Sequence, residues 1–363
     1  MIRFALASLA LVALLAAACL AGGVWPVAAL VYVTLFVALI DRLAARPAAA
    51  REGAGAERFA RALTAALALA HVLLLGLGVW AVARAPWLGP GQAGCLAVAL
   101  GLFMGQVSHP VAHELIHARA RRLRRLGAAI YVSLLFGHHV SAHLRVHHVH
   151  VASARDPNSA ALGVGFYRFW PRAWAGSFMA GLRAETAARR RAGGRRRGLH
   201  PYLGYCAGAA LVLAVAGVLA GLRGVAVYLG LCAYAQMQIL LADYVQHYGL
   251  RRHMGGDGRP EPVGARHGWN APHRCSSALM LNAPRHSDHH CNPARAFPAL
   301  RLDPARMPML PHALPVMAAA ALVPPLWRRM MDGRARRWSG ADGGARGLPH
   351  PAAFARPAEG GRP

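Results

Sequence analysis

The sequence contains no lysine and few acidic residues. Its 363 residues include 14 Asp and Glu against 41 basic residues, all of them Arg, so the formal net charge is +27. Charged residues make up only 15% of the chain and hydrophobic residues 56%, whereas soluble proteins usually carry about 25% charged residues. This composition argues against an ordinary soluble domain. It also argues against nucleic-acid binding, because the Arg residues flank long apolar segments.

Paired cysteines are also absent from the sequence. The six cysteines form no CxxC pair, and four of them lie in apolar stretches. A free cysteine in such a stretch behaves as a small hydrophobic residue. The spacing therefore excludes a disulfide framework, a cysteine-rich zinc site and a fused iron–sulfur electron carrier.

Long apolar segments predict an all-α, polytopic membrane protein. A bilayer core about 30 Å thick requires roughly 20 apolar residues in a helix. We expect one membrane domain over residues 1–332 and a disordered cytoplasmic tail over 333–363, which is rich in Gly, Pro, Ala and Arg. The six expected spans are Phe4–Leu20, Val24–Ile40, Ala62–Val82, Leu96–Ala112, Leu203–Leu222 and Val225–Leu241.

The distribution of Arg predicts the orientation. Arg residues crowd the connection after the second span, the stretch from His113 to Pro201 and everything after His247, whereas the other connections are nearly uncharged. The positive-inside rule then places both termini and both large polar segments in the cytoplasm. We expect the first span to be retained, although its small residues also resemble a signal-peptide cleavage site.

Histidines crowd into four stretches near the ends of the spans. "HELIHARA" carries His113 and His117 four residues apart, so that on a helix they share a face. In "HLRVHHVHV" we expect the first two histidines of His143, His147 and His148 to share a face and the third to lie beside it. The two further stretches are "DYVQHYGL", with His247, and "RHSDHH", with His286, His289 and His290.

These nine histidines are the predicted catalytic and metal-binding residues. Nine imidazoles exceed what one tetrahedral zinc ion uses, and they suit two ions of a metal such as iron. A metal-bound imidazole usually donates its other N–H to a carboxylate or carbonyl. We therefore expect groups near the motifs to orient the ligands, namely Glu114, His138, Asp156, Asp243 and Asp288.

The remaining histidines carry weaker signals. His139, like His138, could line the site or orient a ligand, and His109 and His150 are further candidates for supporting roles. The others are expected to be ordinary polar residues, namely His71, His200, His253, His267, His273, His312 and His350.

Together the motifs resemble the histidine boxes of the membrane-bound alkane 1-monooxygenases, which are related to xylene monooxygenase and the membrane fatty acid desaturases. The resemblance rests on "HELIHA", "HLRVHHVHVASARDPNSA", "DYVQHYGL" and "APRHSDHHCNPARAF", with "GWN" and "LVPPLWRRMMD" in support. It covers about His113 to Asp332, and the six-span plan is similar. His138 matches a further histidine of the family.

The resemblance implies a di-iron centre held by the nine histidines. Such a centre would use O2 to convert a terminal C–H bond of a hydrophobic substrate to a primary alcohol. Electrons would come from NAD(P)H through a reductase and a rubredoxin-type carrier. The expected location is the bacterial inner membrane, in contact with lipid and with no nucleic-acid partner.

Several positions depart from the family pattern. The second box has Ala142 and Val146 where Glu and Gly are usual, and the third has Asp243 and Gln246 where Asn and Glu are usual. The last box begins with residues 283–285, Ala-Pro-Arg, instead of Leu-Gln-Arg. All nine histidines are present, so the resemblance supports an oxygenase more strongly than it supports an alkane substrate.

Three other functions compete with this interpretation. The first is a fatty-acyl desaturase or hydroxylase with a similar histidine-box centre. The second is an intramembrane zinc protease that uses His113, Glu114 and His117, which leaves six motif histidines unexplained. The third is a metal-binding transporter, which would tend to place its ligands near the membrane midplane.

Overall fold

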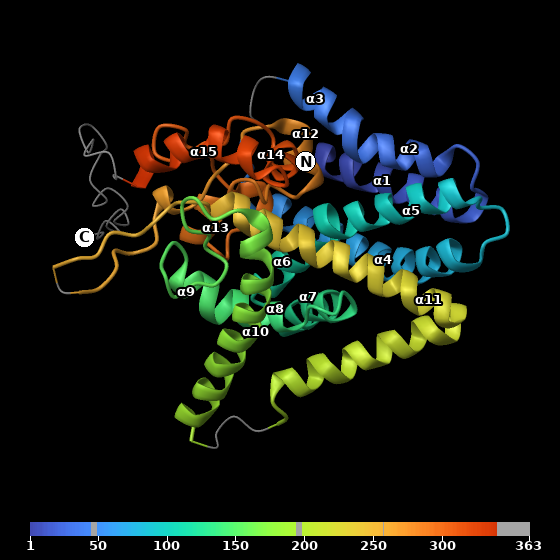
Figure 1. Ribbon diagram of the computed structural model, residues 1–363, viewed down its shortest axis with the longest axis horizontal. Helices are drawn as coiled ribbons and strands as arrows, with labels where there is room; N and C mark the ends of the chain where they lie inside the picture. Colours follow the sequence, from blue (N-terminus) through green and yellow to red (C-terminus); the bar gives the residue numbers. More distant parts are fainter. Residues whose placement is uncertain (45–48, 194–197, 257, 340–363) are drawn as a thin grey trace, which may run out of the picture.

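The computed structural model describes residues 1–44, 49–193, 198–256 and 258–339. In these ranges the ordered elements are helical, and β-structure is limited to two isolated bridges, Met254 with Pro260 and Asn270 with Met309. The predicted all-α class is therefore confirmed. Long helices form a bundle at one end of the molecule, and short helices and loops gather at the other end (Figure 1).

Five helices of the described chain are long and apolar enough to cross a membrane. They contain the predicted apolar segments, and two of them are interrupted by π-helical turns. The five are α1 (Ile2–Ala21); α2 (Trp25–Val31) continued by η1 (Tyr32–Phe36) and α3 (Val37–Leu43); α4 (Ala54–Arg84); α5 (Pro90–Phe103) continued by η2 (Met104–Ser108) and α6 (His109–His117); and α11 (Pro201–His247).

Helix α11 contains the fifth and sixth predicted spans in one 47-residue element. The two predicted spans therefore form the two arms of one kinked helix, so the five long helices contain all six predicted spans. At a rise of about 1.5 Å per residue, α11 is far longer than one bilayer crossing. Its two arms meet at Gly221, whose φ of 66° is readily available only to glycine, and Figure 1 shows the sharp bend. Arg84 Nε donates to the Ala220 carbonyl at 3.1 Å, which ties the bend to the end of α4.

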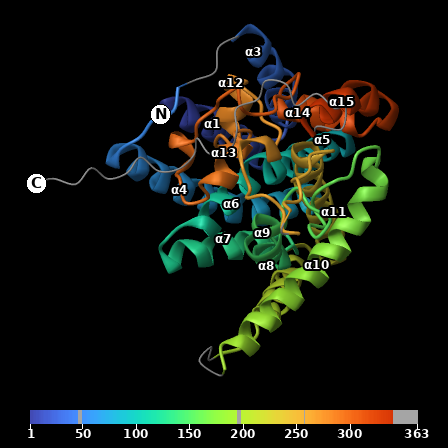
Figure 2. The same cartoon turned by 90° about the vertical axis from the view of Figure 1, so that its left-hand side faces the viewer.

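The other helices lie mainly at the opposite end of the bundle, which we call the polar end. Among them, α10 extends away from the short helices (Figure 2). They are α7 (Arg121–Ser133), α8 (His138–Ala142), the π-helical η3 (His143–His147), α9 (His148–His150), α10 (Phe166–Arg191), the 3₁₀ turns η4 (Ala265–His267) and η5 (Phe297–Ala299), α12 (Arg274–Leu279), α13 (His286–Cys291), α14 (Leu314–Ala321) and α15 (Pro324–Ser339).

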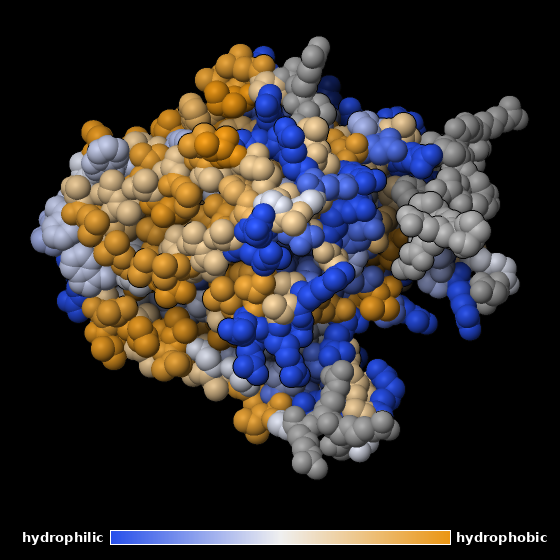
Figure 3. Space-filling view, turned by 180° about the vertical axis from the view of Figure 1, so that it is seen from behind, coloured by the Kyte–Doolittle hydropathy of each residue, from blue (hydrophilic) through white to orange (hydrophobic). Residues whose placement is uncertain are grey.

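The surface divides in the same way. Apolar side chains cover the half formed by the long helices, and hydrophilic side chains cover most of the polar end (Figure 3). Leu69, Leu73, Leu211 and Val218 point outward from this apolar half with exposed fractions of 60% or more. Exposed leucines in such numbers are stable in lipid, so the surface supports the membrane assignment.

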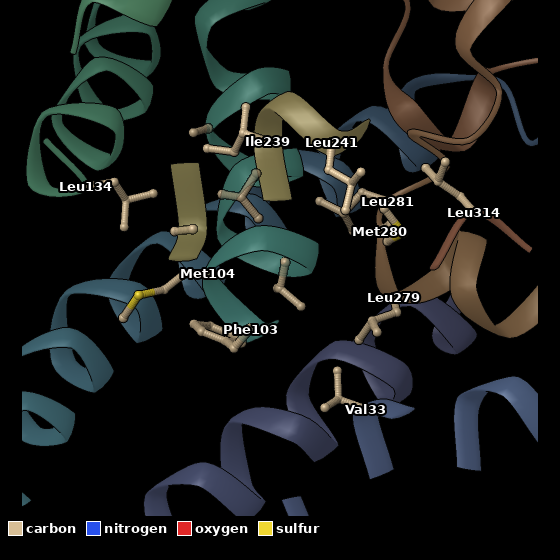
Figure 4. Close-up of a cluster of buried hydrophobic side chains, with 14 of the residues drawn as sticks. Val33, Phe103, Met104, Leu134, Ile239, Leu241, Leu279, Met280, Leu281 and Leu314 are labelled. Carbon is tan, nitrogen blue, oxygen red and sulfur yellow. The ribbon is translucent and has the colours of Figure 1, made fainter. Parts of the chain in front are cut away.

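A buried cluster joins the membrane helices to the polar end. Figure 4 shows Phe103 and Met104 packing near Ile239 and Leu241 of α11 and the segment Leu279–Leu281 that follows from α12. That segment leads directly into α13, which carries the last histidine motif. Packing in this cluster therefore fixes the position of α13 relative to the helices that carry the other motifs.

The C-terminal boundary differs from the expected position. Helix α15 continues past residue 332 to Ser339. The remainder of the predicted disordered tail, residues 340–363, lies outside the described residues, so the disordered tail stays a prediction.

Candidate metal centre

All nine histidines of the four motifs meet at the polar end and form two groups. His113, His117, His143, His148 and His289 make one group, and His147, His247, His286 and His290 make the other. Within each group the available ligand atoms lie within 4.8 Å of one another. We call the first set the five-histidine group and the second set the four-histidine group.

Five separate elements carry these side chains. The first two histidines lie at the end of the helix that rises through the membrane bundle, His247 is the last residue of α11, and the others belong to η3, α9 and α13. The helix spacing i, i+4 brings His113 beside His117 and His286 beside His290. His289 projects from α13 into the other group.

The second motif differs from the expectation. His143 and His147 were expected to share a face, but His143 joins the same group as His148, and His147 joins the other group. The reason is that residues 143–147 form a π-helical turn. A π-helix has a wider turn, with hydrogen bonds from i to i+5, so residues five apart come together. One short turn thereby supplies ligands to both groups.

In the five-histidine group the imidazole Nε2 atoms face one another. His143 Nε2 lies 3.1 Å from His117 Nε2 and 3.0 Å from His148 Nε2, and His289 Nε2 lies 3.1 Å from His148 Nε2. The ring of His113 completes the group, with its centroid 4.3 Å from that of His289.

The four-histidine group is built in the same manner. His286 Nε2 lies 2.8 Å from His247 Nε2 and 3.0 Å from His290 Nε2. The His147 ring lies 4.8 Å from the His247 ring, and its buried Nε2 has no hydrogen-bond partner among the described residues. The two groups adjoin, because the ring centroids of His148 and His290 are 4.6 Å apart.

This donor set fits two metal cations. A neutral imidazole has one N–H donor and one acceptor nitrogen, so several Nε2 atoms directed at one point cannot all be satisfied by one another. A cation at that point would accept all of their lone pairs, and imidazole suits iron, zinc and copper. The orphaned Nε2 of His147 is the clearest sign of such a missing partner.

Burial keeps several of the motif histidines neutral, which is the form of imidazole that binds metal. Burial, with smaller contributions from neighbouring histidines, lowers the pKa values of His286, His289 and His290 well below 6.5. It does the same for the pKa values of His143 and His148. Neutral imidazole is the form that acts as a metal ligand.

Asp156 is the predicted carboxylate that touches a motif histidine. Its Oδ2 atom accepts a hydrogen bond from His147 Nδ1 at 2.8 Å. Burial works against both charges, but the attraction and hydrogen bond between the two groups prevail, so the pKa of His147 is raised and that of Asp156 is lowered. The bond directs His147 Nε2 toward the four-histidine group, as in a carboxylate–histidine–metal arrangement.

The other predicted supporting groups contact residues that surround the nine histidines. Asp243 accepts from the Asn158 side chain at 2.6 Å, and the Asn158 N–H donates to Asp156 Oδ1 at 3.1 Å, so Asp243 reaches His147 only indirectly. The remaining three bond elsewhere: Asp288 accepts from Arg295 at 2.7 Å, Glu114 accepts from the Phe297 N–H at 3.1 Å, and His138 packs edgewise on Trp174 and Phe178.

One supporting contact has no counterpart in the sequence prediction. The backbone carbonyl of His267 lies 3.2 Å from His247 Nδ1 and fixes that ring in the four-histidine group. His267 itself was expected to be an ordinary polar residue, and its side chain does bond away from the centre, to Glu261 at 3.1 Å. Every residue has a carbonyl, so no residue type could signal this role.

A pocket of about 290 Å³ opens beside the five-histidine group. It is lined by His117 and Glu114 together with cationic side chains that include Arg61, Arg119 and Arg295. Glu57 also lines the pocket and pairs with Arg61 at 3.6 Å, and the remaining Arg residues leave a net positive charge beside the centre.

Comparison with known proteins identifies the class. Residues 90–319 match the sequence profile of the family described as fatty acid desaturase. Alkane 1-monooxygenase 1 of Pseudomonas aeruginosa is 33% identical over 279 residues, which cover 75% of this chain and 72% of the relative. Alkane 1-monooxygenase of Ectopseudomonas oleovorans is 30% identical over 292 residues, covering 79% and 71%.

A third relative is the hydroxylase component of the xylene/toluene monooxygenase of Pseudomonas putida, 30% identical over 244 residues that cover 65% of this chain and 62% of the relative. The fold and the histidine groups thus define a histidine-box membrane oxidoreductase. Within that class, the chain belongs to the alkane 1-monooxygenase family, which confirms the resemblance.

Proposed function

We propose that the two histidine groups hold two iron ions and that the enzyme hydroxylates a terminal C–H bond of an alkane, or of another hydrophobic molecule with an alkyl chain, to a primary alcohol. The observation that carries the proposal is the convergence of nine imidazoles into two adjoining groups. The names of the relatives, alkane 1-monooxygenase and xylene/toluene monooxygenase, support the substrate class.

The ligand assignment follows the geometry. The five-histidine group would hold one ion and the four-histidine group the other, and bound iron would supply the activation of O2 for attack on a C–H bond. The overall reaction consumes one O2, two electrons and two protons for each methyl group and releases one water. Of the atoms of O2, one enters the alcohol and the other leaves in the water.

The chain itself contributes orientation and exclusion of water. Asp156 and the His267 carbonyl hold His147 and His247 with Nε2 directed inward. All rings of the four-histidine group are buried. A buried, pre-oriented centre protects a reactive oxidant from bulk water and spares reorganisation during the reaction.

The substrate would arrive from the membrane. An alkane partitions into the bilayer, and the apolar half of the surface supports an inner-membrane location (Figure 3). The start of α1 and the whole of α15 lie toward the polar end, in accord with both termini being cytoplasmic. The metal centre would then face the cytoplasm.

Electrons would come from NAD(P)H through a reductase and a rubredoxin-type carrier. The cationic pocket beside His117 supports approach of an acidic carrier, because opposite charges speed encounter. Further Arg residues begin α7, at Arg121 and Arg122. Positive charge at this membrane face also attracts anionic lipid, so carrier docking needs its own test.

The deciding experiment measures metal content and products together. The purified full-length protein, expressed with ample iron, should contain about two irons per chain and convert n-decane to 1-decanol when supplied with O2, NAD(P)H, a reductase and a rubredoxin. One zinc without iron would overturn the proposal in favour of the protease. Metal-replete protein that releases no alcohol from any alkyl substrate would overturn the hydroxylase assignment.

A fatty-acyl desaturase is the second candidate, since the matched profile carries that description. It would give an alkene in place of an alcohol, so mass spectrometry of the products separates the two. The zinc-protease alternative is tested by Glu114→Ala. That change should abolish a protease but leave an oxygenase with bound iron, because Glu114 bonds to the Phe297 backbone and to none of the nine histidines in the described structure.

A further inference from the structure

Three side chains outside the nine histidines form a polar cluster beside the five-histidine group. His109 Nδ1 of α6 lies 2.9 Å from the Tyr131 hydroxyl of α7. The ring of His139 on α8 lies 4.9 Å from the Tyr131 ring and 5.9 Å from the His109 ring. We call these residues the membrane-side cluster, because His109 lies one turn before His113 on the helix that rises from the apolar bundle.

The membrane-side cluster touches the proposed iron ligands directly. The His139 ring stacks on that of His143, with centroids 5.3 Å apart and an interplanar angle of 30°. The His109 ring lies 6.0 Å from that of His113. The reacting carbon of a substrate at the five-histidine group would therefore lie close to these side chains.

His139 is unusual because it is buried without partners. Its side chain is 1% exposed, and neither ring nitrogen has a hydrogen bond among the described residues. Buried polar atoms are almost always bonded. The buried His71 shows the usual arrangement, in which both ring nitrogens are hydrogen-bonded. Its Nδ1 lies 2.9 Å from Ser108 Oγ and its Nε2 lies 2.8 Å from Ser133 Oγ.

We infer that His139 forms a hydrogen bond to an oxygen function of the substrate, close to the carbon that is oxidised. The substrate would then be an alkyl compound with a hydroxyl or carbonyl group near its reacting end, in preference to a plain alkane. This inference rests on the proposed hydroxylase function and narrows its substrate class.

The chemistry of the cluster favours an uncharged group. The ring contacts of His139 are to Tyr131, Phe136 and the imidazoles of His109 and His143, and these contacts include no Arg side chain that could pair with a carboxylate. A neutral imidazole has one donor and one acceptor nitrogen, and a hydroxyl can bond with either. An alkane would leave both nitrogens unsatisfied.

The test uses a competition within one molecule. In 2-decanol the two methyl ends are chemically similar, but only one lies next to the hydroxyl. Oxidation at the near end gives 1,2-decanediol, and oxidation at the far end gives 1,9-decanediol. For the iron-loaded native enzyme with its electron carriers, we expect the near-end product to exceed the far-end product by roughly tenfold, the discrimination that one strong hydrogen bond supplies.

Two variants and a control identify the residue responsible. His139→Phe keeps an aromatic ring but removes the hydrogen bond, so the product ratio should fall to about one. His139→Gln keeps a donor and an acceptor and should retain part of the preference. His253→Phe makes the same chemical change at an exposed site and should leave the ratio unchanged. The ratio does not depend on how much of a variant is folded.

The outcomes separate this inference from the proposed function. Hydroxylation of n-decane and 2-decanol without end preference, or a preference that survives in His139→Phe, would overturn the inference and leave the hydroxylase intact. If neither compound is oxidised, the hydroxylase proposal fails. Thermal shifts then decide the inference: 2-decanol must stabilise the native protein more than n-decane does, and His139→Phe must remove that difference.

Discussion

The two histidine groups differ in how firmly the surrounding protein holds their rings. In the four-histidine group all rings are buried, and His147 and His247 are anchored through Nδ1 by Asp156 and by the His267 carbonyl. In the five-histidine group three of the rings are only partly buried. Each group also has one buried Nδ1 atom without a partner among the described residues, at His143 and at His290.

The two groups also differ in how accessible they are from outside the protein. The pocket at the polar end is lined by His117 of the five-histidine group and by none of the rings of the four-histidine group. We infer that the enclosed four-histidine group and the more open five-histidine group have different roles. The four-histidine group would fix one ion in place, and the five-histidine group would face substrate and electron carrier.

The largest effect is expected from removing a ligand of the enclosed group. His286→Ala should reduce bound iron to one per chain or less and lower turnover by more than about 1000-fold, because the remaining imidazoles cannot complete the site. Iron analysis and product assays measure both. His117→Ala in the open group should retain more iron than His286→Ala; equal losses would show that the two groups are held alike.

Removing the anchor should have a smaller effect than removing a ligand. Asp156→Asn preserves shape but weakens the hold on His147, and loss of such a partner usually costs about 10–100-fold in metal affinity or activity. Titration of iron against a competing chelator measures this loss. Asp303→Asn, at the surface and far from the histidines in its described bonds, should match the native protein. An unchanged affinity in Asp156→Asn would show that the anchor is dispensable.

Acid should release iron in a pH range set by the histidines. The pKa values of His286, His289 and His290 are well below 6.5 in the folded chain, so the unfolded chain takes up protons first as the pH falls. The stability that these neutral rings provide is complete above about pH 6.5 and declines below it. Dialysis over pH 7.5 to 5 should show iron loss that depends on more than one proton.

The same experiment sharpens the contrast between the groups. Iron should leave the open five-histidine group first, because the pocket beside His117 admits protons and buffer. Spectra recorded during dialysis would show a one-iron intermediate. Loss of both irons in a single step would contradict the difference in access.

The smallest effect concerns the electron carrier. Arg119 lines the pocket and is exposed, so Arg119→Gln should raise the KM for an acidic carrier by roughly threefold and leave iron content unchanged. Added salt should slow the native enzyme more than the variant. Arg223→Gln, exposed at the bend between the arms of α11, is the matched control. A salt response identical in all three proteins would argue against docking at this pocket.

Several features of the fold and site could be predicted because they depend on local pattern. Apolar segments about 20 residues long identify membrane helices whatever their partners are, since lipid itself provides the apolar environment. Histidines three and four residues apart share one side of a helix, which is how His113 meets His117 and His286 meets His290. The motifs were also sufficient to suggest the family to which the chain belongs.

Other features depend on backbone geometry that residue types do not encode. The sequence "HLRVHH" suits an α-helix as well as the observed π-helical turn, yet only that turn places His143 with His148 and sends His147 to the other group. The bend at Gly221 likewise joined two predicted spans into one element. The predicted role of His138 as an orienting group stays a prediction, because its described ring contacts are with other aromatic side chains.

By itself the sequence determined the membrane class and the nine candidate ligands, because composition and short-range spacing follow from the order of residues. Only the tertiary structure decided how the nine divide into an enclosed group and an open one. The same holds for the His267 carbonyl that supports His247 and for the missing partner of His139. Those features arise where segments far apart in the chain pack together, and the directions of carbonyls and ring nitrogens are fixed only there.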